Sequence, residues 1–248
     1  MIKFLRRIRQ NLLIQNKTRP NDSLGRTGRY FKYAIGEIVL VMIGILLALQ
    51  VNNWNENRKI SNTEQLLLRD LKTEIQSNII ALDTIIKSHR ASLDAIITLD
   101  SIITNLKQVN SPLELGSLFK THGFNMTYDP RTGILNSIIN SGKLDYISNR
   151  ELRYKFSSLN DIIIDTNESA NDFSEQRSQF YWPLLGQLYE RQTDERFKFN
   201  SIKILNSSEF NWWLVLAKSS RIEGLAEEND LMKTLKEILE LIENETIK

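Results

Sequence analysis

A long apolar segment, from Tyr33 to Trp54, constrains this chain more than any other feature of its sequence. No residue between Ile38 and Leu49 is polar. With its apolar flanks, the segment reaches about the 20 residues that cross a hydrocarbon core about 30 Å thick. We therefore expect a single transmembrane helix over residues 33–54. The solvent of every other part of the chain then depends on its side of the membrane.

Charged residues are distributed unevenly around this segment, and this distribution indicates its orientation. In the 20 residues after Val51 only three residues are basic. Nine basic residues precede the segment, namely Lys3, Arg6, Arg7, Arg9, Lys17, Arg19, Arg26, Arg29 and Lys32. Short flanks rich in Lys and Arg stay in the cytoplasm. We expect a bacterial inner-membrane protein with a basic cytoplasmic leader over residues 1–32 and a periplasmic domain over residues 55–248.

The apolar segment is interpreted as an uncleaved signal anchor. Its basic region is too long for a removable signal peptide, and no small-x-small cleavage site follows Leu49. The chain contains no cysteine, which excludes both a lipidated lipoprotein and a disulfide scaffold.

The net charge of +2 conceals a partition along the chain. The leader carries +8, from its nine basic residues and Asp22, Glu37 carries −1, and by difference residues 38–248 carry about −5. No large basic face is left outside the membrane, so we expect no nucleic-acid partner. The leader is expected to bind anionic lipid headgroups of the inner membrane.

Within the leader, Ile2–Leu13 is predicted to form a basic amphipathic helix in the interface plane, and residues 16–29 a loop. The alternative for Ile2–Leu13 is a docking handle for a cytoplasmic partner.

After the membrane segment, apolar residues recur at helical spacing from Glu64 to Leu106. The stripe contains Leu68, Leu71, Ile75, Leu82, Ile85, Ile96, Leu99, Ile103 and Leu106, and it is widened by Ile79, Ile86 and Leu93. That width favours a helix buried in a globular bundle over a two-stranded coiled coil. Because residues 45–111 contain no Gly or Pro, we hypothesise that the membrane helix continues into this one.

Further helix starts are marked by capping patterns. Ser111-Pro112 with Glu114 predicts one helix, and Asp129-Pro130 predicts a short helix that ends near Ser141-Gly142. Ser148 with Glu151 repeats the capping-box spacing before a long helical pattern.

That long pattern runs through Leu152, Phe156, Leu159, Ile163 and Phe173, and it is expected to kink or break at Pro183. Ser207 or Ser208 is expected to cap a final helix through Trp212, Leu216, Ile222, Leu225, Leu231, Leu235, Ile238 and Ile242. The predicted fold class is all-α, with an extracytoplasmic antiparallel bundle of three to four long helices and a short helical insert.

Few residues are suited to catalysis or metal binding. The two histidines, His89 and His122, cannot assemble a recognisable zinc or Cys–His site without cysteine, so we expect no catalytic residue, metal or cofactor. His89 lies on the helical stripe with Asn78 and Ser92. We interpret these three as a polar layer that sets helix register, with a pH- or ligand-sensing layer as the alternative.

Other distinctive residues receive structural interpretations. Ser141-Gly142-Lys143 lacks the upstream glycine and the following Ser or Thr of a phosphate-binding loop. Glu227-Glu228 is interpreted as a solvated helix surface. The aromatic clusters Phe180-Tyr181-Trp182 and Trp212-Trp213 are expected in the core, with the lining of a ligand pocket as the alternative.

Glu37 is the one residue with a functional claim inside the membrane segment. An intramembrane carboxylate is costly unless it reaches the headgroups or finds a partner. Glu37 shares a helical face with Val41, Gly44 and Ala48, and Gly44-x-x-x-Ala48 is a small-xxx-small contact motif. This face is expected to pack against another membrane helix or a second copy. The alternative is that Glu37 simply extends to the headgroups.

Two blocks of the sequence resemble a known family. The segment from Tyr33 to Arg58 resembles the opening of a family of uncharacterised single-span bacterial envelope proteins, classed as a domain of unknown function. The segment from Ile139 to Arg153 is similar to that family's second recurring block. The resemblance implies a membrane anchor followed by a helical extracytoplasmic domain. It implies no activity, ligand or catalytic residue.

These observations favour a non-enzymatic membrane-anchored protein that senses or scaffolds through protein–protein contacts. The alternative is an accessory single-span subunit of a membrane transport or ion-driven complex, with Glu37 as a proton or ion site. Hydrolase activity is disfavoured because no nucleophile–base constellation is present.

Overall fold

The computed structural model describes residues 23–104, 112–187, 189–190, 198–199 and 201–246, and it divides after Lys59 into two units. The predicted helix Ile2–Leu13 and the predicted cap Ser111 lie outside the described residues. Helix α2, Ser23–Ile103, contributes to both units, which confirms that the helix of the apolar segment continues into the next one. The loop predicted over residues 16–29 is wrong from Ser23 onward. Cooperative extension of a long helix outweighs the cost of about 1 kcal/mol for each glycine in it.

The all-α prediction is confirmed, because every long described element is a helix. The described residues also contain a two-residue antiparallel pair, β1 (Tyr189–Glu190) and β2 (Lys198–Phe199). The helical elements after α2 are α3 (Pro112–Thr121), α4 (Gly133–Asn140), η1 (Lys143–Tyr146), α5 (Arg150–Thr166), α6 (Glu168–Gln176), η2 (Arg177–Tyr181), α7 (Trp182–Gln187), α8 (Ser201–Leu205) and α9 (Ser208–Thr246).

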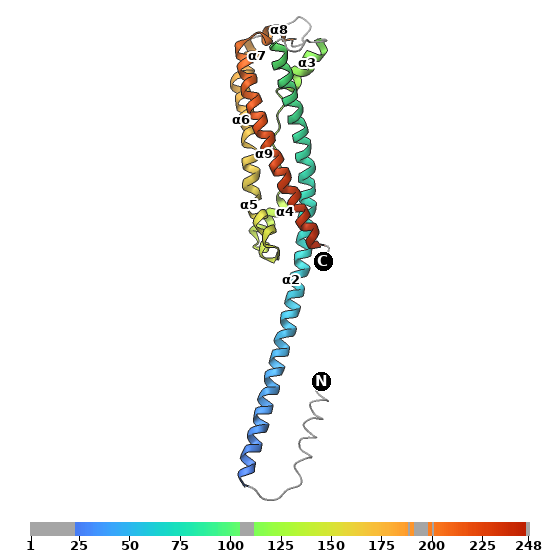
Figure 1. Ribbon diagram of the computed structural model, residues 1–248, viewed down its shortest axis with the longest axis vertical. Coiled ribbons are helices and arrows are strands. Elements are labelled where there is room, and N and C mark those ends of the chain that lie inside the picture. The colour runs from blue at the N-terminus through green and yellow to red at the C-terminus, as the bar shows by residue number, and fades with distance from the viewer. Residues whose placement is uncertain (1–22, 105–111, 188, 191–197, 200, 247–248) are drawn as a thin grey trace. The chain divides into compact units, whose positions relative to one another are not determined.

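The second unit, residues 60–246, is a bundle built on α2, on the succession α5 to α7, and on α9 (Figure 1). Contacts show that α9 runs antiparallel to α2. Lys72 pairs with Glu243, whereas Asp100, further along α2, pairs with Lys218 near the start of α9. The expected antiparallel bundle is therefore present. Its third column, the succession α5 to α7, is interrupted.

The sequence did not predict where the succession α5 to α7 is interrupted. Asn167 separates α5 from α6, and the π-helical segment η2 ends immediately before α7. The Trp182 N–H reaches back to the Arg177 carbonyl across this wider turn. Pro183 is thus the second residue of α7, and the helix continues beyond it to Gln187. Of the two expected outcomes at Pro183, the break is wrong, because the π turn before the ring absorbs the irregularity, and the kink stays a prediction.

The core of this unit consists of two apolar clusters. The first cluster contains Leu68, Leu82, Phe156, Leu235 and Ile242, among others, and the second is centred on Trp213, Phe210 and Phe173. Buried polar side chains lie between the two clusters along each helix. We call them the polar belt: His89, Ser92, Thr166, Ser169, Ser220, Arg221 and Glu228. At this level α6 and α9 approach closely, since a Cβ on Gly224 would lie 3.3 Å from Ser169 Cβ.

Candidate functional site

An extended segment from His122 to Thr132, which we call the strap, connects α3 to α4 inside the bundle. Its contacts show that it runs antiparallel to α2, since Ser92 contacts His122 and Asn78 contacts Arg131. An extended segment without a β-ladder partner must find other partners for its backbone N–H and C=O groups. In this chain the partners are side chains of α2, η2 and α9 and of the α5–α6 junction.

Carbonyl groups at the start of the strap accept hydrogen bonds from three helical elements. Ser92 Oγ of α2 donates to the His122 carbonyl at 2.8 Å, and Arg177 of η2 donates to the Gly123 carbonyl at 2.5 Å. Arg221 of α9 donates to the Phe124 carbonyl at 2.8 Å. Its guanidinium also lies over the Phe173 ring, 4.0 Å from the centroid. Burial lowers the pKa of Arg221 to about 10, and the nearby Glu228 carboxylate opposes this shift.

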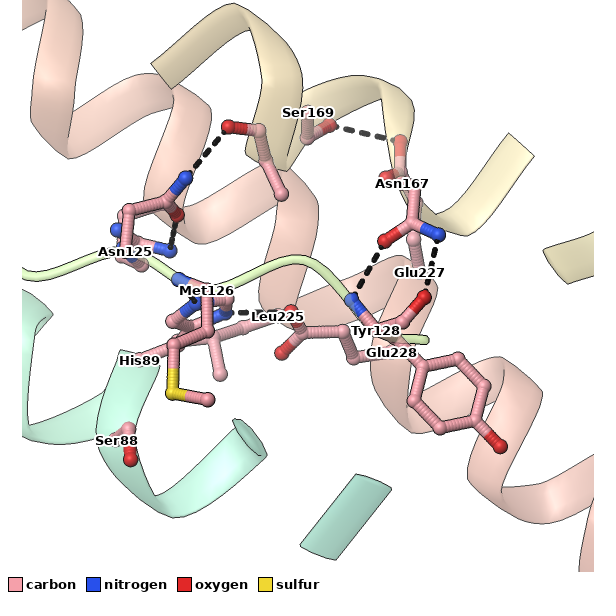
Figure 2. Close-up of polar contacts among 12 residues, drawn as sticks. Ser88, His89, Asn125, Met126, Tyr128, Asn167, Ser169, Leu225, Glu227 and Glu228 are labelled. Atoms are coloured by element: carbon pink, nitrogen blue, oxygen red, sulfur yellow. Dashed lines mark hydrogen bonds and ion pairs between the residues drawn. The ribbon is translucent and has the colours of Figure 1, made fainter. Parts of the chain in front are cut away.

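His89 binds the middle of the strap with one ring nitrogen and α9 with the other (Figure 2). Nε2 accepts the Met126 N–H at 3.1 Å, and Nδ1 lies 2.5 Å from Glu228 Oε1. Because Nε2 accepts, the proton of the neutral imidazole is assigned to Nδ1, which donates to the carboxylate. His89 is 1% exposed and Glu228 3%. The pair has the arrangement of the acid and base in a catalytic triad, but backbone occupies the nitrogen that would act as base.

Two asparagines connect the strap with α6, Asn167 from the α5–α6 junction and Asn125 from the strap itself (Figure 2). Asn167 makes a double contact with Tyr128, accepting its N–H at 2.8 Å and donating to its carbonyl at 2.9 Å. Asn125 donates to the Ala170 carbonyl at 2.8 Å and to Ser174 Oγ at 2.7 Å. Asn125 Oδ1 also accepts from Arg221 at 3.1 Å.

The end of the strap is held by α2 and determines where α4 begins. Asn78 donates to the Arg131 carbonyl at 2.7 Å and accepts its N–H at 2.8 Å. Glu74 then accepts the N–H groups of Ile134 and Leu135 at 2.8 and 3.0 Å. The prediction that this helix opens at Asp129-Pro130 is wrong by a few residues. Asn78 keeps Arg131 extended, and a carboxylate from another helix caps the first turn of α4.

A similar contact from α2 modifies the predicted cap of α5. Glu64 Oε1 accepts both the N–H and the hydroxyl of Ser148, at 2.6 and 2.7 Å. Asn149 is the N-cap instead, and its side chain accepts the Leu152 N–H at 3.1 Å. The predicted capping box on Ser148 is therefore wrong by one residue, because Glu64 engages the serine. In contrast, Ser207 caps α9 by accepting the Phe210 N–H at 3.2 Å, as one of the two predicted alternatives.

The three residues of the predicted polar layer are all buried, and each contacts the strap. His89 and Ser92 lie in the polar belt, whereas Asn78 lies further back along α2, beside the first apolar cluster. The interpretation of Glu227-Glu228 as a solvated surface is wrong. Glu228 is buried against His89, and Glu227 accepts from Ser169 Oγ at 3.0 Å. The sequence contains a signal for the burial of Glu228. On the buried stripe of α9, Glu228 lies two helical turns after Arg221 and two helical turns before Leu235.

Only some residues of the two predicted aromatic clusters lie in the core. Tyr181 and Trp213 are buried and stacked, with ring centroids 4.6 Å apart. Their neighbours Phe180, Trp182 and Trp212 are exposed, which corrects the expectation for these three. Ile222, predicted in the stripe of the final helix, is exposed as well.

His122, at the start of the strap, enters the second apolar cluster. Its ring lies edge-on to Trp213 at a centroid distance of 4.9 Å. Burial lowers the pKa of His122 to about 4, against the opposing effect of the hydrogen bond to the Leu118 carbonyl. His122 is therefore a neutral core residue at neutral pH, and this position was not predicted.

The predicted membrane face lies in the first unit. Glu37, Val41, Gly44 and Ala48 are exposed on α2, and a Cβ on Gly44 would meet no atom within 4 Å. The described part of α2 includes one stretch that is long and apolar enough to cross a membrane, with none of its apolar window buried. Nothing in the described part of this chain covers that face.

Several residues that build the strap site had no functional signal in the sequence. Asn125, Asn167, Arg177, Glu64 and Glu74 are common polar residues at unremarkable positions, and their roles depend on contacts with distant backbone. Among the described residues no group of three or more His, Asp and Glu side chains is placed to hold a metal ion.

Comparison with known proteins agrees with the resemblance seen in the two sequence blocks. No curated protein and no solved structure matches this chain. Residues 37–215 match DUF6090, a family of unknown function. The match spans most of the apolar part of α2, the strap and α5 to α7, and it ends within the first part of α9, before Arg221 and Glu228. With well over half of its length matched, the chain belongs to the DUF6090 family of unknown function.

Proposed function

We propose that this chain is a non-enzymatic, membrane-anchored protein that senses or scaffolds through protein–protein contacts. The observation that carries the proposal is the uncovered apolar stretch of α2, in which every described side chain from Tyr33 to Trp54 is exposed. A helix that is apolar on all sides and lacks a protein cover is stable in lipid. The basic leader supports a cytoplasmic N-terminus and a periplasmic location for residues 55–248, and it supports binding to anionic headgroups of the bacterial inner membrane.

Reporter fusions test this topology. Alkaline phosphatase fused after Lys248 is expected to be active, and the same enzyme fused before Met1 inactive, because it folds only in the oxidising compartment. The reverse pattern would overturn the orientation. Recovery of the full chain in the soluble fraction would overturn the anchor itself.

The absence of enzymatic activity is supported by the use of the buried polar side chains. His89, Glu74 and Asn78 each bind backbone of the chain's own strap or of α4, so none presents a free reactive group. Full-length protein in detergent is expected to hydrolyse neither peptidoglycan nor ester substrates above a buffer control. Hydrolysis that is lost on His89→Gln would contradict the proposal.

The partner is proposed to be another membrane helix or a second copy, packed on the face formed by Glu37, Val41, Gly44 and Ala48. Small residues at Gly44 and Ala48 allow helix backbones to approach closely in lipid. A photo-crosslinking residue at Ala48 is expected to give an adduct in native membranes, and one at Leu46, about half a turn away, is expected to give much less. An adduct at twice the chain mass indicates self-association, and equal labelling at both positions would argue against a specific face.

A second candidate is an accessory single-span subunit of a transport or ion-driven complex. The observation in its favour is an exposed carboxylate, Glu37, within the family-matched apolar segment. Such groups mark ion or proton pathways when they face a partner. Under this candidate Glu37→Gln abolishes function in a deletion strain, whereas under the sensing or scaffolding proposal it is nearly silent.

A further inference from the structure

We propose that His89 is an acid-sensitive latch, in which protonation of Nε2 releases the strap at Met126 while Glu228 retains the imidazolium. The inference concerns residues 60–246 alone, and it depends neither on the proposed membrane location nor on the identity of a partner. It goes beyond the proposed function by assigning a stimulus and a moving element to the bundle.

The latch follows from the hydrogen-bond pattern at the two ring nitrogens. In the closed arrangement Nε2 is an acceptor, because it faces the Met126 N–H at 3.1 Å. A proton added to Nε2 turns it into a second donor, and two donors cannot share that contact. The Met126 contact is then lost, whereas the contact between Nδ1 and Glu228 becomes an ion pair.

The charges around His89 decide which side of the ring is released. On α9, the Glu228 carboxylate lies 2.5 Å from Nδ1, and it also acts on the Arg221 guanidinium, whose pKa it raises against the effect of burial. Arg221 is itself held on the strap through Phe124 and Asn125. The remaining charged or titratable groups at this level have other contacts: Arg177 with Gly123, Glu227 with Ser169 on α6, and His122 with Leu118. The Glu228 carboxylate therefore keeps its contact with the imidazolium, and the Met126 N–H of the strap is the group that is released.

Local opening at Met126 exposes little additional apolar surface. The side chains of Phe124 and Met126 are already 42% and 43% exposed. His122 and Tyr128 lie on either side of Met126 and are 0% and 3% exposed. Tyr128 stays anchored in the first apolar cluster, and His122 stays packed against Trp213 of the second. Segments with exposed side chains and few buried contacts open at low free-energy cost. The release is thus confined to the Met126 N–H, between Asn125, which stays bound to Ala170, and Tyr128, which stays bound to Asn167.

Hydrogen–deuterium exchange on the full-length chain in detergent micelles tests the latch. After correction for the intrinsic pH dependence of exchange, the Met126 amide is expected to exchange at least about tenfold faster at pH 5.5 than at pH 7.5, because a proton on Nε2 removes the acceptor of the Met126 N–H. Amides in the middle of α9 are expected to keep their protection. In His89→Gln, which cannot titrate, the pH dependence at Met126 is expected to disappear. Glu240→Gln, at an exposed position of α9, is the matched control and should respond as wild type.

Two outcomes would overturn the proposal: equal Met126 protection at both pH values in the wild type, or an unchanged pH dependence in His89→Gln. If His89→Gln fails to fold, nitrogen NMR of the wild-type imidazoles decides the question. His89 Nε2 is expected to gain its proton over the same pH range in which Met126 loses protection. A His89 ring that stays neutral while the strap opens would assign the release to another group.

Discussion

Residues 33–54 and residues 64–92 belong to the same helix, α2, but their side chains are used in opposite ways. In the first region the side chains are apolar and exposed on all sides of the helix. In the second, Glu64, Glu74, Asn78, His89 and Ser92 are buried and bind backbone elsewhere in the chain. Exposure alone therefore does not show whether a side chain lies on an apolar or a polar surface. Leu46 and Leu66 are 60% and 58% exposed, but Leu46 lies in an apolar run from Ile38 to Leu49. The residues one helical turn from Leu66 are polar, namely Asn62, Thr63, Arg69 and Asp70.

The largest effect is expected from a cavity in the buried region. Leu82 is 0% exposed in the first apolar cluster, and Leu82→Ala is expected to lower the free energy of unfolding by about 2–5 kcal/mol. Leu46→Ala is the control, because its side chain contacts no protein core. Urea unfolding of the full chain in mild detergent, followed by tryptophan fluorescence, measures both. A loss below about 1 kcal/mol for Leu82→Ala would mean that the core is not packed as described.

A charge in each region gives the next largest contrast. Leu46→Arg places a cation near the middle of the apolar segment, at an expected cost of about 2.5–3.5 kcal/mol in membrane insertion. Leu66→Arg, on the exposed surface of the same helix, is expected to have little effect. The fraction of the chain that resists extraction by alkaline carbonate measures both variants. If Leu46→Arg stays fully in the membrane fraction, residues 33–54 are not the anchor.

The pH dependence of stability tests the buried side of the comparison. The pKa of His122 is about 4 in the folded chain, and the ordinary value is 6.5. Its contribution is therefore fully present above pH 6.5 and is lost as the pH falls towards 4, up to about 3 kcal/mol. The stability difference between wild type and His122→Gln should narrow over this range in urea titrations. A difference that stays constant would place His122 in contact with solvent.

The smallest effect is expected from a single contact of the strap. Asn78→Ala removes both hydrogen bonds to Arg131, with an expected loss of about 1–3 kcal/mol because the freed backbone groups are partly buried. Asn62→Ala, on the exposed surface of α2, is the matched control and is expected to lie within about 0.5 kcal/mol of wild type. Equal effects in the two variants would show that Asn78 contributes nothing specific to the strap.

Much of the fold could be predicted from the sequence. The long apolar helical segment, the continuous α2, the start of α3 at Pro112 and the cap of α9 all follow from apolar length, periodicity and capping residues. These signals are local, since each depends on residues within a few turns of one another. Where a contact came from a distant element, the prediction failed. Asn78 and Glu74 moved the start of α4, Glu64 displaced the predicted cap of α5, and Asn167 interrupted the third column.

The candidate site was predictable only in part. His89, Asn78 and Ser92 stand out as polar residues on an apolar stripe, but the stripe does not show that their partners are backbone groups of the strap. Glu228 was assigned to the surface because two adjacent acids usually lie in solvent. Adjacent residues on a helix point in different directions, about 100° apart, so one of the pair can be buried while the other lies near the surface.

The sequence by itself determined the long apolar segment, the helical class and the place of His89, Asn78 and Ser92 on the apolar stripe of a buried helix. These features depend on the length and spacing of residue types along the chain. Only the tertiary structure decided what the buried polar residues do. His89 and Glu228 are 139 residues apart, and His89 and Met126 are 37 apart. Which donor meets which acceptor over such separations depends on how the helices and the strap pack against one another, and no local pattern encodes that choice.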